Sequence, residues 1–197
     1  MKLIVIAGVA VTTLLALAAC TTPVSSQTPL ASSGPSSPTT SKLTAPQVSN
    51  PLDVSKFEQD PCKVLSQAQA SQVANLTTSS KADGNVAPIC SWADSNHNTV
   101  AFGFVPGNGG LSTVYKNQDN KSGYFKVAPD VAGYPAAFFG SHDDRNRGGC
   151  QVAVGVSNDE VITISTDFRN SSPYYSDPCP VVLKAAEAAM ATLKGGA

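Results

Sequence analysis

The sequence predicts an α+β domain in which a mainly antiparallel sheet is flanked by an N-terminal and a C-terminal helix and is held by two disulfides. Three observations predict this fold class. Short runs of alternating apolar residues are paired across polar turns, as is typical of β-hairpins. Two amphipathic segments, each opened by Asp-Pro-Cys, bracket these runs. Four of the five cysteines lie within the same stretch of chain.

Residues 1–19 have the composition of a lipoprotein signal peptide. Lys2 supplies a positive charge, and the apolar run that follows is shorter than the ~20 residues needed to span a bilayer. The run ends in Leu17-Ala18-Ala19-Cys20, where small residues precede a thiol. We expect cleavage between Ala19 and Cys20 and attachment of diacylglycerol and a further acyl chain such as palmitate to Cys20, because two chains make a stable anchor. The alternative is an ordinary secretory peptide with an incidental cysteine.

Residues 20–52 form a polar tether. Ser, Thr and Pro dominate this stretch, and Lys42 is its only charged residue. Such a composition cannot bury enough apolar surface to offset the entropy of ordering. We therefore expect a disordered tether up to residue 52 and a single folded domain over residues 53–197. A glycosylated stalk is an alternative role, because Ser/Thr-Pro tracts accept O-linked sugars.

Helices are expected at three places in the domain. Asp60-Pro61-Cys62 sets an N-cap residue before a proline at the first helical position, and apolar spacing extends this helix from 61 to 76. The same opening, Asp177-Pro178-Cys179, begins a C-terminal helix that ends at Gly195-Gly196. A shorter helix is expected from Leu111 to about Gln118.

Strands are expected between these helices. Residues 90–93 pair with 99–105, and 150–156 pair with 161–168, each across a polar turn. Further strands are expected over 124–127 and 135–139. Hairpins of this kind, rather than strand–helix–strand units, imply a mainly antiparallel sheet with helices packed on it.

The four domain cysteines are expected to form two bridges. Alternation places Cys90 on the strand face of Trp92 and Cys150 on a face of valines, so both point toward the helix layer. Export would oxidise these thiols, and four cysteines allow three connectivities. We favour Cys62–Cys90 and Cys150–Cys179, because each ties a helix start to a strand. Each bridge would contribute about 3–4 kcal/mol in the chain-entropy model.

The order and local sequence of these elements resemble a family of actinobacterial lipoproteins known as domain of unknown function 3558. The resemblance is carried by Asp60-Pro61-Cys62 with Leu65, Cys90-Ser91-Trp92, Val131-Ala132-Gly133-Tyr134-Pro135-Ala136, Cys150-Gln151-Val152 and Asp177-Pro178-Cys179. It covers the domain after the tether and implies an envelope-exposed domain with four paired cysteines, without an established activity. The topology is also similar, by analogy, to the Mog1/PsbP type, which is used mostly for binding.

The sequence offers little material for catalysis. It contains no nucleophile elbow, phosphate-binding loop or zinc-protease motif, and the absence of a Cys-x-x-Cys pair disfavours a structural zinc. A net charge of −1 provides no basic patch for nucleic acid. The polar loop from Ser141 to Arg145 holds Ser, His and Asp, but neighbours on one loop rarely converge on a substrate. We expect no catalytic residue, metal or cofactor.

A candidate binding surface is formed by aromatic, proline and histidine residues outside the predicted strand cores. Its members are Tyr134, Pro135, His142, Tyr174 and Tyr175. A second aromatic group is interpreted as core, with a ligand surface as the alternative. Its members are Tyr124, Phe125, Tyr134, Phe138 and Phe139. Trp92 is also expected in the core.

These features predict a non-enzymatic binding or interaction module, anchored by lipid at the extracytoplasmic face of the cell membrane, with an envelope protein as its partner. One alternative is a carrier of lipid or another small apolar ligand, held in a pocket between sheet and helices. A third hypothesis is a hydrolase that uses His142 and a nearby carboxylate. The sequence specifies neither the partner nor the oligomeric state.

Overall fold

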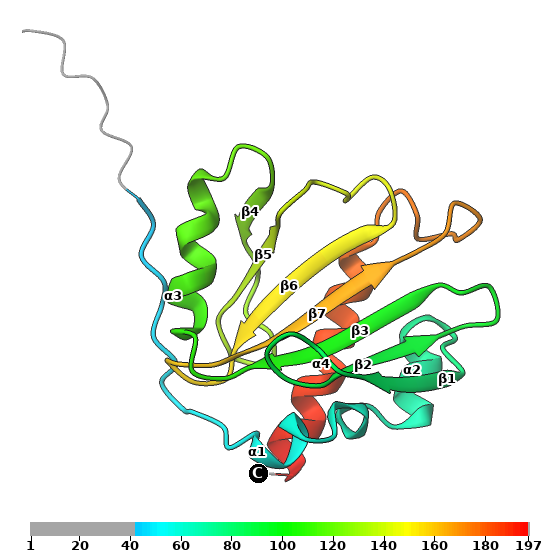
Figure 1. Cartoon of the computed structure of the whole chain (residues 1–197), viewed down its shortest axis with the longest axis horizontal. Helices are drawn as coiled ribbons and strands as arrows, with labels where there is room; N and C mark the ends of the chain where they lie inside the picture. The colour runs from blue at the N-terminus through cyan, green and yellow to red at the C-terminus, as the bar shows by residue number, and fades with distance from the viewer. Residues whose placement is uncertain (1–41, 197) are drawn as a thin grey trace, which may run out of the picture. The chain divides into compact units, whose positions relative to one another are not determined.

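The computed structural model describes residues 42–196, which form one seven-stranded antiparallel sheet flanked by helices (Figure 1). The strand order is β1-β2-β3-β7-β6-β5-β4. The strands are β1 Thr78–Ala82, β2 Ile89–Ala93, β3 Thr99–Val105, β4 Tyr124–Val127, β5 Ala136–Gly140, β6 Gly149–Gly155 and β7 Val161–Asp167. The predicted α+β class, the two predicted hairpins and the two further predicted strands are confirmed. The signal peptide, Cys20 and the tether up to residue 41 lie outside the described residues.

The inner face of the sheet carries the main core. Phe102 on β3 faces Ile164 on β7 at the centre of the sheet, and both side chains are fully buried. The long C-terminal helix α4, Cys179–Gly196, crosses this face, and α2, Gln67–Ala74, packs beside it. Fully buried alanines on α4 let its backbone approach the strands closely: Ala185, Ala186 and Ala189. Each large apolar side chain buried here contributes about 1.5–3 kcal/mol.

The outer face is covered over only part of its area. Helix α3, Gly110–Tyr115, packs Leu111 and Val114 onto Ala153 and its neighbours in β5 and β7. A short 3₁₀ helix, η2 Lys116–Asp119, continues it. Together these two elements account for the helix predicted from Leu111 to Gln118.

Both disulfides have the predicted partners. Cys62 joins Cys90 with a Cα–Cα distance of 5.0 Å, and Cys150 joins Cys179 at 5.3 Å. The first links a 3₁₀ helix, η1 Pro61–Val64, to β2, and the second links β6 to the first residue of α4. Disulfides persist in oxidising compartments, so these two bridges indicate an extracytoplasmic location. Within residues 42–196, no helix combines the length and the hydrophobicity needed to cross a membrane.

The helix predicted over residues 61–76 is interrupted at Leu65. That residue is extended, with φ −125° and ψ 135°, and its side chain is buried. Ser66 then caps α2: its hydroxyl accepts from the Gln69 N–H while the Gln69 amide oxygen accepts from the Ser66 N–H. This reciprocal capping box outcompetes continuation of the first helix. Asp60 makes no capping hydrogen bond and instead pairs with Lys63 at 3.2 Å.

Two short elements were not predicted. Helix α1, Ser55–Glu58, precedes η1 and buries Phe57. Strand β1 lies at one edge of the sheet, and all five of its residues are exposed. A polar strand without apolar alternation gives no periodic signal, because neither of its faces is buried.

The folded domain begins before the expected boundary at residue 53. Val48 is only 5% exposed, and its N–H donates to Asn158 Oδ1 at 2.8 Å. The Leu52 N–H donates to the Val156 carbonyl at 2.9 Å. The prediction of a disordered tether up to residue 52 is therefore wrong for its last part, because Val48 and Leu52 supply apolar anchors within a polar composition.

The backbone at Gly148 leaves no room for a side chain. Its φ is +84°, and a Cβ added there would lie 2.1 Å from the Phe168 carbonyl oxygen. Gly107 also has a positive φ, +65°, but an added Cβ would meet nothing within 4 Å. We expect Gly148→Ala to lower the free energy of unfolding by about 3 kcal/mol and Gly107→Ala by about 1 kcal/mol. Urea denaturation measures both; equal losses would contradict this account.

Candidate functional site

The structure places the five residues of the predicted binding surface at three separate positions. Tyr134 and Pro135 precede β5, whereas His142 follows the other end of that strand. Tyr174 and Tyr175 lie in the loop before α4. The predicted residues are therefore not brought together into one surface.

Tyr134 belongs to the core and not to the surface. It is 7% exposed, and its backbone exchanges two hydrogen bonds with Val131, at 2.9 and 3.0 Å. The turn between them uses Ala132 at φ +53° and Gly133 at φ +87°, and Lys194 Nζ donates to the Ala132 carbonyl at 3.2 Å. This left-handed turn directs the Tyr134 ring into the core. The neighbouring glycine and proline are typical of an exposed loop, and for that reason they suggested a surface position for Tyr134.

Tyr174 and Tyr175 are half-buried and hold their loop against the sheet. The Tyr174 ring packs on Phe168 with 5.6 Å between centroids. The Tyr175 carbonyl accepts a hydrogen bond from the Gly148 N–H at 2.8 Å. Of the predicted surface residues, His142 alone is exposed.

The second aromatic group is packed, as the core interpretation predicted. Phe125 meets Tyr115 of α3 edge to face at 4.8 Å, and Phe139 lies against the same small core. Tyr124 and Phe138 are each 7% exposed and belong to the main core. Trp92 is also core, at 5% exposed.

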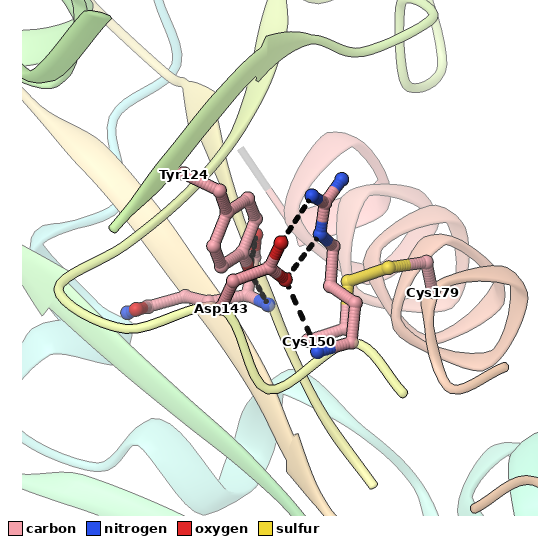
Figure 2. A network of polar contacts seen from close by, with 6 residues as sticks. Tyr124, Asp143, Cys150 and Cys179 are labelled. Carbon is pink, nitrogen blue, oxygen red and sulfur yellow. Dashed lines mark hydrogen bonds and ion pairs between the residues drawn. A yellow bond between two sulfur atoms is a disulfide. The ribbon is translucent and has the colours of Figure 1, made fainter. Parts of the chain in front are cut away.

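A site that the sequence did not predict is built around Tyr124 (Figure 2). The Arg145 guanidinium lies 4.4 Å from the centre of the Tyr124 ring. Asp143 fixes that guanidinium with two hydrogen bonds of 2.7 Å, one from Nε and one from Nη2. We call Tyr124, Asp143, Arg145 and Gln151 the Tyr124 network. Figure 2 shows it beside the disulfide between β6 and α4.

The Tyr124 hydroxyl closes a gap in the sheet. The register between β5 and β6 ends at Phe138 and Val152, although β6 continues to Gly149. Beyond that point the Gln151 N–H donates to Tyr124 Oη at 2.8 Å. The phenol reaches this group from β4, a strand away, and satisfies a partly buried donor, which would cost about 1–3 kcal/mol if it were left unsatisfied in a fully buried site.

The network keeps its charges over a wide pH range. Hydrogen bonds from Arg145 lower the pKa of the Asp143 carboxyl, and the same bonds raise the pKa of Arg145. Burial raises the pKa of the Tyr124 phenol, against smaller opposing effects of the Gln151 hydrogen bond and the Arg145 charge. The tyrosine is therefore neutral while the Asp–Arg pair is ionised, which suits a recognition surface.

Two hollows flank the Tyr124 network. One of about 170 Å³ lies between the ends of β5 and β6 and is lined by Tyr124, His142 and Gln151, among others. The other, of about 440 Å³, lies toward the start of α4. Its walls are Lys126, Phe138, Asp143, Arg145, Asn146, Asp177 and Cys179. Most of these side chains are charged or polar.

The loop after β5 does not assemble an acid–base relay. Ser141 Oγ lies 3.2 Å from His142 Nδ1, and both residues are exposed. The neighbouring carboxylates are occupied, Asp143 by Arg145 and Asp144 by Arg147 at 2.5 Å. Within residues 42–196, no group of three His, Cys, Asp or Glu side chains is placed to bind a metal.

Comparison with known proteins returns one family. The model of the family described as "Protein of unknown function (DUF3558)" matches residues 15–192. Searches of the curated proteins and of the solved structures return no match.

The hydroxyl of Tyr124 should have a measurable energetic role. We expect Tyr124→Phe to lower the free energy of unfolding by about 1–2 kcal/mol, because the Gln151 N–H loses its acceptor while the ring stays under Arg145. Tyr175→Phe is the matched control, since no described residue bonds to the Tyr175 hydroxyl, and it should change stability by less than about 0.5 kcal/mol. Chemical denaturation of both variants checks this; similar losses would refute the assigned role.

Proposed function

We propose that this chain, which belongs to the DUF3558 family of proteins of unknown function, is a lipid-anchored binding module on the extracytoplasmic face of a cell membrane. Cys20 is the proposed attachment point for the lipid. The Tyr124 network and its two hollows are the proposed recognition surface. The proposed partner is another protein of the cell envelope.

The anchor is supported by the start of the chain. Residues 1–19 read as a leader, and Leu17-Ala18-Ala19-Cys20 supplies the small residues and thiol that lipid attachment requires. Two disulfides in the domain require the same exported location. An actinobacterial lipoprotein is also what the local sequence resembles.

The recognition surface is supported by one observation above others: Arg145 is held over an aromatic ring by a bidentate carboxylate. A guanidinium fixed in this way loses little side-chain entropy on binding a partner. Its side chain is 36% exposed and that of Asp143 is 48% exposed, so both remain accessible. Tyr and Arg are also the residue types that dominate binding energy in protein interfaces.

The charge of the larger hollow favours a protein partner over an apolar ligand. Lys126 and Arg145 bring positive charge, while Asp143 and Asp177 bring negative charge. Complementary charges of both signs are common in protein interfaces, where they fix orientation. A lipid or similar ligand would instead require a continuous apolar wall.

Removal of the Cys20 thiol should release the protein. We expect Cys20→Ser to shift the chain from the membrane fraction to the soluble or secreted fraction, because no acyl chain can then be attached. The double variant Cys62→Ser/Cys90→Ser is the control, since it also removes thiols but should stay with the membrane. Fractionation followed by immunoblotting measures both. Membrane retention of the Cys20→Ser chain would refute the anchor.

Contact with a partner should be detectable beside the Tyr124 network. A photoreactive residue at His142, which is exposed at the rim, should give a crosslinked adduct of defined mass in intact cells. The same residue at Val86, which is 67% exposed in a different loop, is the control. Adding Arg145→Ala should abolish the adduct from position 142. The same adducts from both positions, or an adduct that survives Arg145→Ala, would argue against this surface.

A further inference from the structure

The turn between β6 and β7 holds the segment that enters the domain. As described above, this turn accepts one hydrogen bond from the Val48 N–H, at Asn158 Oδ1, and one from the Leu52 N–H, at the Val156 carbonyl. The segment 42–54 therefore has two of its backbone anchors on the five residues 156–160. We call the segment 42–54 the entry segment.

A buried valine adds an apolar anchor at the same place. The Val48 side chain is seated over Gly155, at the end of β6. A methyl group added at Gly155 would lie 3.0 Å from Val48 Cγ2 and 3.0 Å from Leu111 Cδ1. The absence of a side chain at Gly155 thus makes the slot that receives Val48.

The third contact between the turn and this part of the chain joins two acids. Glu160, the last residue of the turn, has a buried Oε1 that receives no hydrogen bond from a conventional donor. The Glu58 carboxyl of α1 lies within hydrogen-bond reach of it. Two ionised carboxylates would repel here, so the contact requires a proton on one of them.

The surroundings of Glu160 carry further negative charge and, among the described residues, no positive group paired with its carboxylate. Asp53, just before α1, also acts on it, and Asp53 stays ionised because hydrogen bonds from Ser55 lower its pKa. The one basic group in this cluster, Lys56, acts on Asp53. No Lys or Arg among residues 42–196 forms an ion pair with Glu160.

We propose that the β6–β7 turn is a proton-dependent clasp for the entry segment. While a proton is shared between Glu160 and Glu58, the turn stays against α1, and Val48 and Leu52 remain bonded to it. Loss of the proton pushes the turn and α1 apart and weakens both backbone bonds. The stretch from Val48 to Leu52 then loosens from the turn, while Leu43 stays bonded to Gln118 and α1 keeps Phe57 in the core.

The direction and range of the switch follow from the environment of Glu160. Burial, followed by the charge of Glu58, raises the pKa of Glu160 from 4.5 to about 7. The raised pKa of an acid means that the docked state binds the proton more tightly than the released state. Docking is therefore strongest below about pH 5 and is weakened as the pH rises through 7.

Amide hydrogen exchange in the full chain tests the clasp. Protection at Val48 and Leu52, corrected for the intrinsic pH dependence of exchange, should fall by about threefold between pH 6 and pH 8.5. This is below the roughly tenfold limit that a pKa raised from 4.5 to about 7 sets between these two pH values, because Glu160 is only half-buried. The Ile164 amide in the core should keep its protection.

The variant Glu160→Gln should remove the fall, because glutamine keeps the shape without the charge. Asp159→Asn, at the exposed neighbouring position, is the matched control and should retain it. If Glu160→Gln does not fold, Glu58→Gln should also abolish the fall. A wild-type chain whose entry segment is equally protected at both pH values would overturn the proposal. So would a fall that persists in Glu160→Gln, or one shared by Ile164. None of these results bears on the lipid anchor, which is tested separately.

Discussion

The domain depends on two covalent links between helix starts and inner strands. Cys62–Cys90 holds η1 against β2, and Cys150–Cys179 holds the first residue of α4 against β6. Each is worth about 3–4 kcal/mol in the chain-entropy model, against a total stability of roughly 5–15 kcal/mol for an ordinary domain. The links also fix where each helix begins. The alanine-rich face of α4 then packs on the valines and isoleucines of the sheet at one fixed position along the strands.

The proposed recognition surface depends on the same constraint. The Cys150–Cys179 bridge ties β6 to α4. The pairing between β5 and β6, in contrast, ends at Phe138. The chain between these strands crosses the resulting gap as an exposed loop that carries Asp143 and Arg145. Tyr124 fills the gap from β4 and gives Arg145 a flat support. A local departure from regular pairing thereby becomes a fixed arrangement of Tyr124 and Arg145.

Sequence reasoning recovered what periodicity and covalent chemistry control. Alternation located the central strands, and strand parity with helix openings selected the disulfide partners. It failed where a local competitor or a distant contact decides the structure. The capping box at Ser66 interrupted the first helix, and β1 has no buried face to reveal it. The Tyr124 network joins residues up to 27 positions apart, from β4, β6 and the loop after β5, and no local sequence pattern predicts such a contact.

The two edge strands of the sheet, β1 and β4, affect how copies of the protein pack beside one another. β1 is short, fully exposed and polar, and it carries Lys81, whose ammonium reaches back to the Gln59 carbonyl. The opposite margin, β4, has only four residues. Neither margin presents the long, flat, apolar ladder on which strands of separate molecules polymerise. Copies held at high local density can therefore stand side by side without their sheets growing into one another.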